Sequence, residues 1–526
     1  MSHYETCQAG LSGDGGTYSS EDMLECISTE MEKSADARDE DLKAFLFVLA
    51  GAMIFFMQSG FAMVCAGAVR LKNVQNSMLK NLLDACGAAV AFFLVGNAFA
   101  FGGQWETSAT TFVGLSEFAS IGPSAPFWFF EYTFSATSVT IVAGTLAERC
   151  QMVAYLCYSM FLAGIIYPVV AHSLWSNNGF ISNFNVDPFM GSGAIDFAGS
   201  GVVHLTGGIT ALFATIILGP RRGRFYDAQG MPLSKPKPFP GHSMALQLLG
   251  TMVLWFGWFG FNPGSALLLD GNVGEIAANA AVSTALAGAS GGIAALFTNL
   301  FVEERQTGEP HFSLVMAMNG SLSGLVAITA GCALVEPWAA LVIGIVSGWV
   351  YMASSALLIK LKIDDAVDAI PVHMFNGIWG MIATGIFASP EKMEVTYGVS
   401  KHVGVVYSWA RGSSDGALLA CQTLACLFII GWTMVTVFPF FVWLNYRGWL
   451  RSDSLEELVG LDISYHGGGG KPGEEGEVRK EYVDAYRRQK SANSRSSAPN
   501  TTTTAADLDS SADWRASDKI DDEDDI

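Results

Sequence analysis

Long apolar runs constrain the fold of this chain more than any other feature of its sequence. Eleven runs reach about 20 residues or more, the length of helix that crosses the hydrocarbon core of a bilayer. We therefore predict an all-α polytopic membrane protein with eleven transmembrane helices, near residues 42–66, 81–101, 127–147, 152–175, 197–218, 243–263, 277–301, 311–330, 337–359, 366–388 and 416–446.

The composition fits a membrane protein and argues against other classes. Of the 526 residues, 51% are hydrophobic and only 15% are charged, and the 57 glycines suit close helix packing. No basic patch supports nucleic-acid binding. The nine cysteines lack metal-ligand spacing, and no nucleophile–base pair is evident. We expect no nucleic-acid partner, no metal, no cofactor and no enzymatic activity.

Lys and Arg in the short loops predict the orientation of the chain. One set of loops holds most of them: Arg70, Lys72, Lys80, Arg149, Arg221, Arg222, Arg224, Lys235, Lys237, Arg305, Lys360 and Lys362. The other set holds only Lys392, Lys401 and Arg411. The first set is therefore predicted to be cytoplasmic, with the N-terminus outside and the C-terminus inside. Runs one to five and runs six to ten then cross the membrane in opposite directions. This predicts a 5+5 inverted repeat plus one extra helix.

This topology divides the chain into four segments. Residues 1–41 form an acidic extracellular segment without a cleavable signal peptide, and residues 42–446 form the membrane domain. Residues 447–470 mix apolar and charged side chains and form a cytoplasmic tail that can fold. Residues 471–526 have low complexity and are predicted to be disordered.

Cys7 and Cys26 lie in the polar outer segment, where disulfides persist. We predict that they are bonded. The sequence leaves open whether the bond lies within one chain or joins two chains.

A motif of Asp, seven residues and His occurs once in each half, at Asp196–His204 and Asp365–His373. Each His would lie about 12 Å along a helix from its Asp, so that both histidines reach the middle of a core about 30 Å thick. Ionisable groups at that depth are costly and mark conduction paths. The alternative is two helix-capping aspartates and two packed histidines.

Aromatic side chains gather at the predicted outer ends of three runs. They include Phe134, Trp175 and Phe261, with Ser265 close by in sequence. Aromatic faces attract small cations once water is excluded. An interfacial aromatic belt is the alternative, and it is the better interpretation for Phe256 and Phe259.

Several of these stretches resemble motifs of one family. Ala143-Gly-Thr-Leu-Ala-Glu148-Arg149, Asp196-Phe-Ala-Gly-x-x-Val-Val-His204, Gly257-Trp-Phe-Gly-Phe-Asn262 and Gly460-Leu-Asp-Ile-Ser-Tyr-His466-Gly are similar to motifs of the ammonium transporters, the Amt/Mep/Rh proteins. They cover about residues 40–470 in the expected order. The run count and the outer N-terminus are most similar to the eukaryotic plant-type Amt branch.

The resemblance implies a homotrimer in the plasma membrane, surrounded by lipid, with one narrow hydrophobic pore per subunit. It implies that ammonium, and methylammonium as an analogue, is recruited at the outer side by Trp175, Phe134 and Ser265, in a region that Asp196 shapes. Phe130, Phe134 and Phe261 match the stacked gate, and His204 and His373 match the twin histidines of the pore. Trp258, Asn262 and Asp365 match supporting positions.

Two positions depart from the family pattern. Glu131 stands where Gln is usual, and an outer carboxylate there would raise the local cation concentration; a satisfied structural acid is the alternative. Ser464 stands where plant-type relatives generally have Thr, whose phosphorylation is a shut-off signal. The resemblance therefore implies a kinase acting on Ser464.

We consider two other functions besides ammonium transport. One is an ammonium sensor, or transceptor, whose tail signals while little substrate moves. The other is an Rh-like neutral gas channel, against which a steady ammonium-evoked current would argue.

Overall fold

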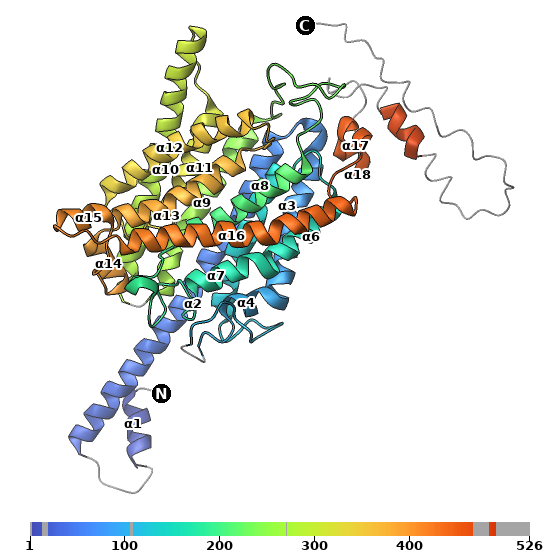
Figure 1. Cartoon of the computed structure of the whole chain (residues 1–526). Coiled ribbons are helices and arrows are strands. Elements are labelled where there is room, and N and C mark those ends of the chain that lie inside the picture. Colours follow the sequence, from blue (N-terminus) through green and yellow to red (C-terminus); the bar gives the residue numbers. More distant parts are fainter. Residues whose placement is uncertain (1–2, 13–18, 106–108, 270, 467–482, 491–526) are drawn as a thin grey trace, which may run out of the picture.

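The computed structural model describes residues 3–12, 19–105, 109–269, 271–466 and 483–490, and within them every regular element is a helix (Figure 1). All eleven predicted runs correspond to helices. The bounds are α2 (Ser20–Ala68), α3 (Val74–Ala91) with α4 (Asn97–Phe101), α5 (Ala125–Thr145), α6 (Met152–Phe161) with α7 (Tyr167–Trp175), α8 (Thr206–Leu218), α9 (Met244–Phe261), α10 (Val273–Thr307), α11 (Leu314–Ile328), α12 (Pro337–Lys360), α13 (Asn376–Phe387) and α16 (Ala417–Tyr446).

Among the described residues, nine helical stretches are long and apolar enough to cross a membrane. The stretches around α5 and α11 are not among them. Helix α5 carries Glu131 and many hydroxyl side chains, and α11 has only 15 residues. The all-helical membrane fold is therefore confirmed, whereas the count of eleven crossings and the orientation stay predictions.

Four spans contain a turn of π-helix, which the apolar pattern did not predict. These turns are η2 (Phe92–Gly96), η3 (Leu162–Ile166), η5 (Ser200–Leu205) and η7 (Ile370–Phe375). Single π-turns often lie at functional sites. Two of the four, η5 and η7, contain the histidines of the repeated motif.

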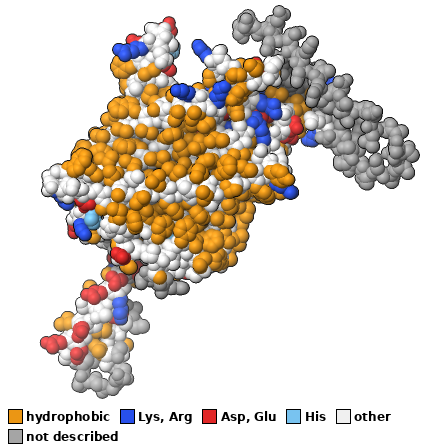
Figure 2. Space-filling model, viewed as in Figure 1, with side chains coloured by type: hydrophobic (Ala, Val, Ile, Leu, Met, Phe, Trp, Pro, Cys, Tyr) orange, Lys and Arg blue, Asp and Glu red, His pale blue; other side chains and the backbone are white. Residues whose placement is uncertain are grey.

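The face seen in Figure 2 carries a broad apolar band with charges toward its ends. Lys and Arg are most frequent at the end where the tail helices lie, and acidic side chains gather on the projecting N-terminal helices. This is the asymmetry from which the sequence predicts the cytoplasmic side.

Residues 3–12 and 20–41 of the N-terminal segment are helical, a structure that their polar composition did not predict. Helix α1 (His3–Ser12) lies against the first part of α2, and Cys7 is bonded to Cys26 within the chain. Helix α2 is 49 residues long and runs without a break from this hairpin into the bundle (Figure 1).

The tail forms two short helices, α17 (Ser454–Val459) and α18 (Leu461–His466), against the end of the bundle. Residues 483–490 are also helical, so the prediction of disorder for 471–526 is wrong for these eight residues. The Tyr486 hydroxyl donates to the Ser464 carbonyl, 3.0 Å away, which ties this short helix to α18. The rest of that predicted segment lies outside the described residues.

Candidate functional site

The two histidines of the repeated motif meet in the centre of the bundle. The Nδ1 atoms of His204 and His373 are 3.1 Å apart, and the rings stack with centroids 5.1 Å apart. Both side chains are buried. At this distance one ring donates its N–H to the other, so the pair shares one hydrogen between the two Nδ1 atoms.

The two aspartates of the motif cap the π-turns that hold the histidines. The Asp196 carboxylate accepts hydrogen bonds from the backbone N–H groups of Gly199, Gly201 and Val202, at 2.8 to 3.1 Å. Asp365 accepts from Val367 and Ile370, at 3.1 and 2.7 Å. Both aspartates therefore cap the start of a helical turn, as the alternative interpretation of the motif predicted.

The predicted helical rise of about 12 Å between each Asp and its His is wrong. Helix begins at Ser200 in the first copy, because Gly199 has φ +106°, a left-handed conformation that interrupts the run predicted at 197–218. The second copy begins its helix at Ile370, after Asp368 with φ +58°.

A column of aromatic rings lies between the predicted outer end and the histidines. Trp175 meets Phe134 edge to face, with centroids 5.6 Å apart, and Phe134 lies 4.2 Å from Phe261. Phe130 packs 4.9 Å from Phe134, and Phe261 stacks 5.6 Å from His204. Phe130, Phe134 and Phe261 are buried, so the column is closed.

The remaining residues predicted for the outer site hold this column in place. The Trp175 indole N–H donates to the Asp196 carbonyl at 2.7 Å. The Ser265 hydroxyl donates to the Phe261 carbonyl at 2.9 Å, which leaves its lone pairs free to accept a hydrogen bond. The Asn262 amide donates to the Thr284 hydroxyl at 2.9 Å and thereby fixes the end of α9.

Trp258 and Phe61 contact the histidine pair from two sides. The Trp258 ring stacks on His204 with centroids 5.4 Å apart, and its N–H donates to Thr329 at 3.1 Å. Phe61 of α2 lies 6.1 Å from His373. Sequence reasoning missed Phe61, since it is one of several aromatic residues in the first apolar run and belongs to no motif.

A cavity of ≈ 30 Å³ lies on the other side of His373. Its wall is apolar apart from a few groups, among them Thr140, Asn319 and the His373 imidazole. Gly144 near the end of α5 and Val367 before η7 also line it. The histidine pair thus separates a closed aromatic column from a small, mostly apolar chamber.

Glu131 does not lie at an open mouth. It is 2% exposed, within α5, and its Oε2 atom has no hydrogen-bond partner among the described residues. A carboxyl at that depth cannot concentrate cations from solution, so the predicted role as an exposed attractor is wrong.

An ion-pair network closes the end of the bundle where the tail lies. The Arg221 guanidinium binds Asp364 at 2.8 and 2.9 Å and Glu148 at 2.9 Å, and Arg70 binds Glu148 at 2.6 Å. Burial alone would raise the pKa of both carboxyls. The guanidiniums outweigh it and hold the pKa of Glu148 and of Asp364 below their ordinary values.

We expect Arg221→Ala to destabilise the protein by about 3 to 5 kcal/mol, because it leaves two buried carboxylates without their main partner. Thermal unfolding of the purified protein in detergent measures this. The control is Arg222→Ala, whose side chain is half exposed, with an expected loss under about 1 kcal/mol. Equal losses in the two variants would contradict the network's role. Since the two carboxyl pKa values are lowered, the stabilisation is present above about pH 4 and is lost as the pH falls below it.

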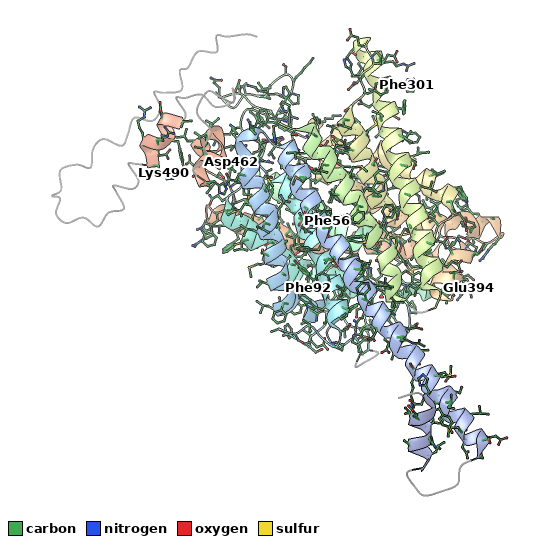
Figure 3. All side chains as sticks on the ribbon, turned by 180° about the vertical axis from the view of Figure 1, so that it is seen from behind. Phe56, Phe92, Phe301, Glu394, Asp462 and Lys490 are labelled. Atoms are coloured by element: carbon green, nitrogen blue, oxygen red, sulfur yellow. A yellow bond between two sulfur atoms is a disulfide. The ribbon has the colours of Figure 1, made fainter. Side chains whose placement is uncertain are left out.

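The tail docks on the start of the second span. The Asp462 carboxylate of α18 accepts from the backbone N–H groups of Asn76 and Gln75, at 2.7 and 3.0 Å, and so caps α3 (Figure 3). Lys72 donates to the Leu458 carbonyl at the end of α17, at 2.7 Å. The Ser464 side chain is 8% exposed, and its hydroxyl donates to the Gly460 carbonyl.

Comparisons with known proteins agree on one family. A sequence model of the Ammonium Transporter Family matches residues 45–471. "Ammonium transporter 1 member 3" of Solanum lycopersicum is 41% identical over 83% of this chain and 95% of its own length. "Ammonium transporter 1 member 1" of Oryza sativa is 43% identical over 77% and 81%.

Two solved structures share the fold. A chain described as "Sensor Amt Protein" matches with TM-score 0.67 and 31% identity, over 81% of this chain and 98% of its own. Mep2 of Candida albicans matches with TM-score 0.66 and 25% identity, over 79% and 87%.

Proposed function

The chain belongs to the ammonium transporter family, in its plant-type Amt branch, and from this premise we propose how it moves its substrate. It is a multi-pass membrane transporter of ammonium and not an enzyme. The proposed route is a narrow pore through each subunit, from Trp175 through the ring column and past His204 and His373 to the apolar chamber.

The observation that carries this proposal is the buried histidine pair at the end of a closed aromatic column. The edges and faces of Trp175 and Phe134 suit a small cation. The Ser265 hydroxyl, which already donates to Phe261, accepts an N–H from that cation. Potassium has a similar size but has no hydrogen to donate and no proton to lose, so this site and the apolar path beyond it disfavour it.

Passage requires that ammonium lose its charge, because the buried apolar rings of Phe134 and Phe261 lie between the outer site and His204. Ammonia then enters once the two Phe rings rotate apart. The histidine pair accepts and donates hydrogen bonds at mid-depth, where ammonia would otherwise lose all of them. His373 passes ammonia into the chamber, and the proton, which the histidine pair hands along, rejoins ammonia at the cytoplasmic side.

We further propose that the protein works as a homotrimer in the lipid of the plasma membrane, that methylammonium is a second substrate, and that the tail regulates the pore through a protein kinase. The direct contact of α18 with the start of α3 supports the regulatory part. The broad apolar band of Figure 2 fits a surface in lipid.

The test is simultaneous measurement of labelled methylammonium uptake and ammonium-evoked current in cells that express the protein. We expect both to rise above those of control cells, with no current evoked by potassium. The likeness to a chain described as a sensor favours a second candidate, a sensor that moves little substrate. Surface expression without uptake would favour the sensor, and uptake without current would favour a neutral gas channel.

A further inference from the structure

The apolar chamber beyond His373 ends near the predicted cytoplasmic side. It follows one face of α5, because Thr140 and Gly144, one helical turn apart, both line it. Gly144 comes four residues before Glu148 of the ion-pair network, so it marks the end of the chamber that lies closest to that network. On the proposed route, ammonia leaves the chamber at this end.

Two side chains face the bare backbone of Gly144. A Cβ placed on Gly144 would clash with a methyl carbon of Val367 and would lie 3.1 Å from the Cys65 Sγ atom. All three residues line the chamber, and we call this place the inner mouth. Gly144 and Cys65 are buried, whereas Val367 is partly exposed. The Val367 isopropyl group and the absence of a side chain at Gly144 therefore set the width of the inner mouth.

The backbone that carries Val367 is held on both sides. The Val367 N–H donates to the Asp365 carboxylate at 3.1 Å. The next residue, Asp368, has φ +58°, and its carboxylate accepts from Tyr351 and Ser355 at 2.9 and 3.3 Å. A β-branched side chain also has few χ1 rotamers. Val367 therefore cannot withdraw to make room for a larger group opposite it.

One guanidinium joins the two walls of the inner mouth. Glu148 follows Gly144 by four residues, and Asp364 precedes Val367 by three. Arg221 binds the first carboxylate at 2.9 Å and the second at 2.8 Å. The ion-pair network thus holds the α5 wall and the Val367 wall at a fixed spacing.

We propose that Gly144 and Val367 determine the largest amine that this transporter releases, so that the inner mouth discriminates ammonia from its methyl derivative. The inference rests on the proposed transport function and adds selection by size to the selection of a cation at Trp175 and Phe134. Those rings attract ammonium and methylammonium alike, since both are small cations. A tight apolar site separates two ligands that differ by one carbon by about 10- to 200-fold.

The test is the ratio of labelled methylammonium uptake to labelled ammonium uptake, measured in cells that express the full chain. This ratio does not depend on the amount of protein at the surface. Val367→Ala removes two carbon atoms from one wall, and we expect the ratio to rise about tenfold. Gly144→Ala adds one carbon to the other wall, and we expect the ratio to fall about tenfold. The double variant should return close to the unchanged ratio, because the two changes compensate.

The matched controls are Gly431→Ala and Val435→Ala in α16. A Cβ on Gly431 would have no neighbour within 4 Å, and Val435 is 60% exposed, so both controls should keep the unchanged ratio.

An unchanged ratio in Val367→Ala overturns the inference, and it does so even if Gly144→Ala fails to reach the cell surface. A double variant with a ratio as low as that of Gly144→Ala overturns it too, since the two positions would then not act across one opening. In either case uptake by the unchanged protein leaves the transport function standing. Uptake of neither substrate by the unchanged protein overturns the transport function itself.

Discussion

The His204→Ala, His373→Ala double variant is expected to lose selective ammonium transport while still reaching the cell surface. The two imidazoles share a hydrogen bond of 3.1 Å in the centre of the bundle, and on the proposed route they are the polar groups that ammonia meets after the column. Their removal leaves an apolar void in which ammonia has no partner. We expect labelled uptake to fall by about 100-fold, or potassium to enter if water fills the enlarged space.

His172 offers a matched control for this variant. It is also a buried histidine in a membrane span, but its ring nitrogens bind the Ala100 carbonyl and the Thr111 hydroxyl, both at 2.8 Å. His172→Ala should therefore lower the amount of protein at the surface, with transport per molecule unchanged. Normal uptake together with normal exclusion of potassium in the double variant would refute the role of the pair.

Ser464→Asp is expected to abolish current while Ser464→Ala keeps it. Ser464 is packed inside the tail, one turn from Gly460, and lies two residues from the carboxylate that caps α3. A second negative group there must lose its water and lies close to Asp462. We expect α18 to lift off, which removes the cap from α3. Removal of the hydroxyl alone breaks only one hydrogen bond within α18.

Co-expression of Ser464→Asp with unchanged protein tests whether a change in one subunit also affects transport by its neighbours. If each tail also touches a neighbouring subunit, current should fall faster than the fraction of mutant protein. A strictly proportional fall would rule out coupling between subunits. Full current in cells that express Ser464→Asp alone would show that a negative charge at this position does not close the pore.

The sequence predicted best what depends on local pattern. Each of the eleven apolar runs coincides with helix in the structure, and the repeated Asp–His spacing pointed to the pair that meets at 3.1 Å. Interruptions were missed because a π-turn changes the hydrogen bonding of an apolar run without changing its composition. The only sign of the break in the sequence is Gly199 itself, and it could not be told apart from the many other glycines of the chain.

Contacts between distant segments were beyond sequence reasoning. Asp462 caps α3 by accepting from the N–H of Asn76, 386 positions earlier in the chain, and the motif around Asp462 did not predict this contact. The Glu148 motif was recognised, but its partner Arg221 follows 73 residues later. The sequence placed Glu131 on the right helix but predicted an exposed side chain. Its burial depends on which helices pack against α5, and a single sequence does not give that packing.

The unbroken course of α2 has a mechanical consequence. A helix of 49 residues is about 74 Å long, and this one joins the disulfide-linked hairpin to the bundle. Along the way Phe47 lies 5.2 Å from Phe130 of the ring column, and Phe61 borders His373. A force on the N-terminal hairpin, such as that from a bound antibody, would be transmitted along α2 to the residues that pack against Phe130 and His373. We therefore expect that a binder held at this hairpin, away from the proposed pore, slows transport.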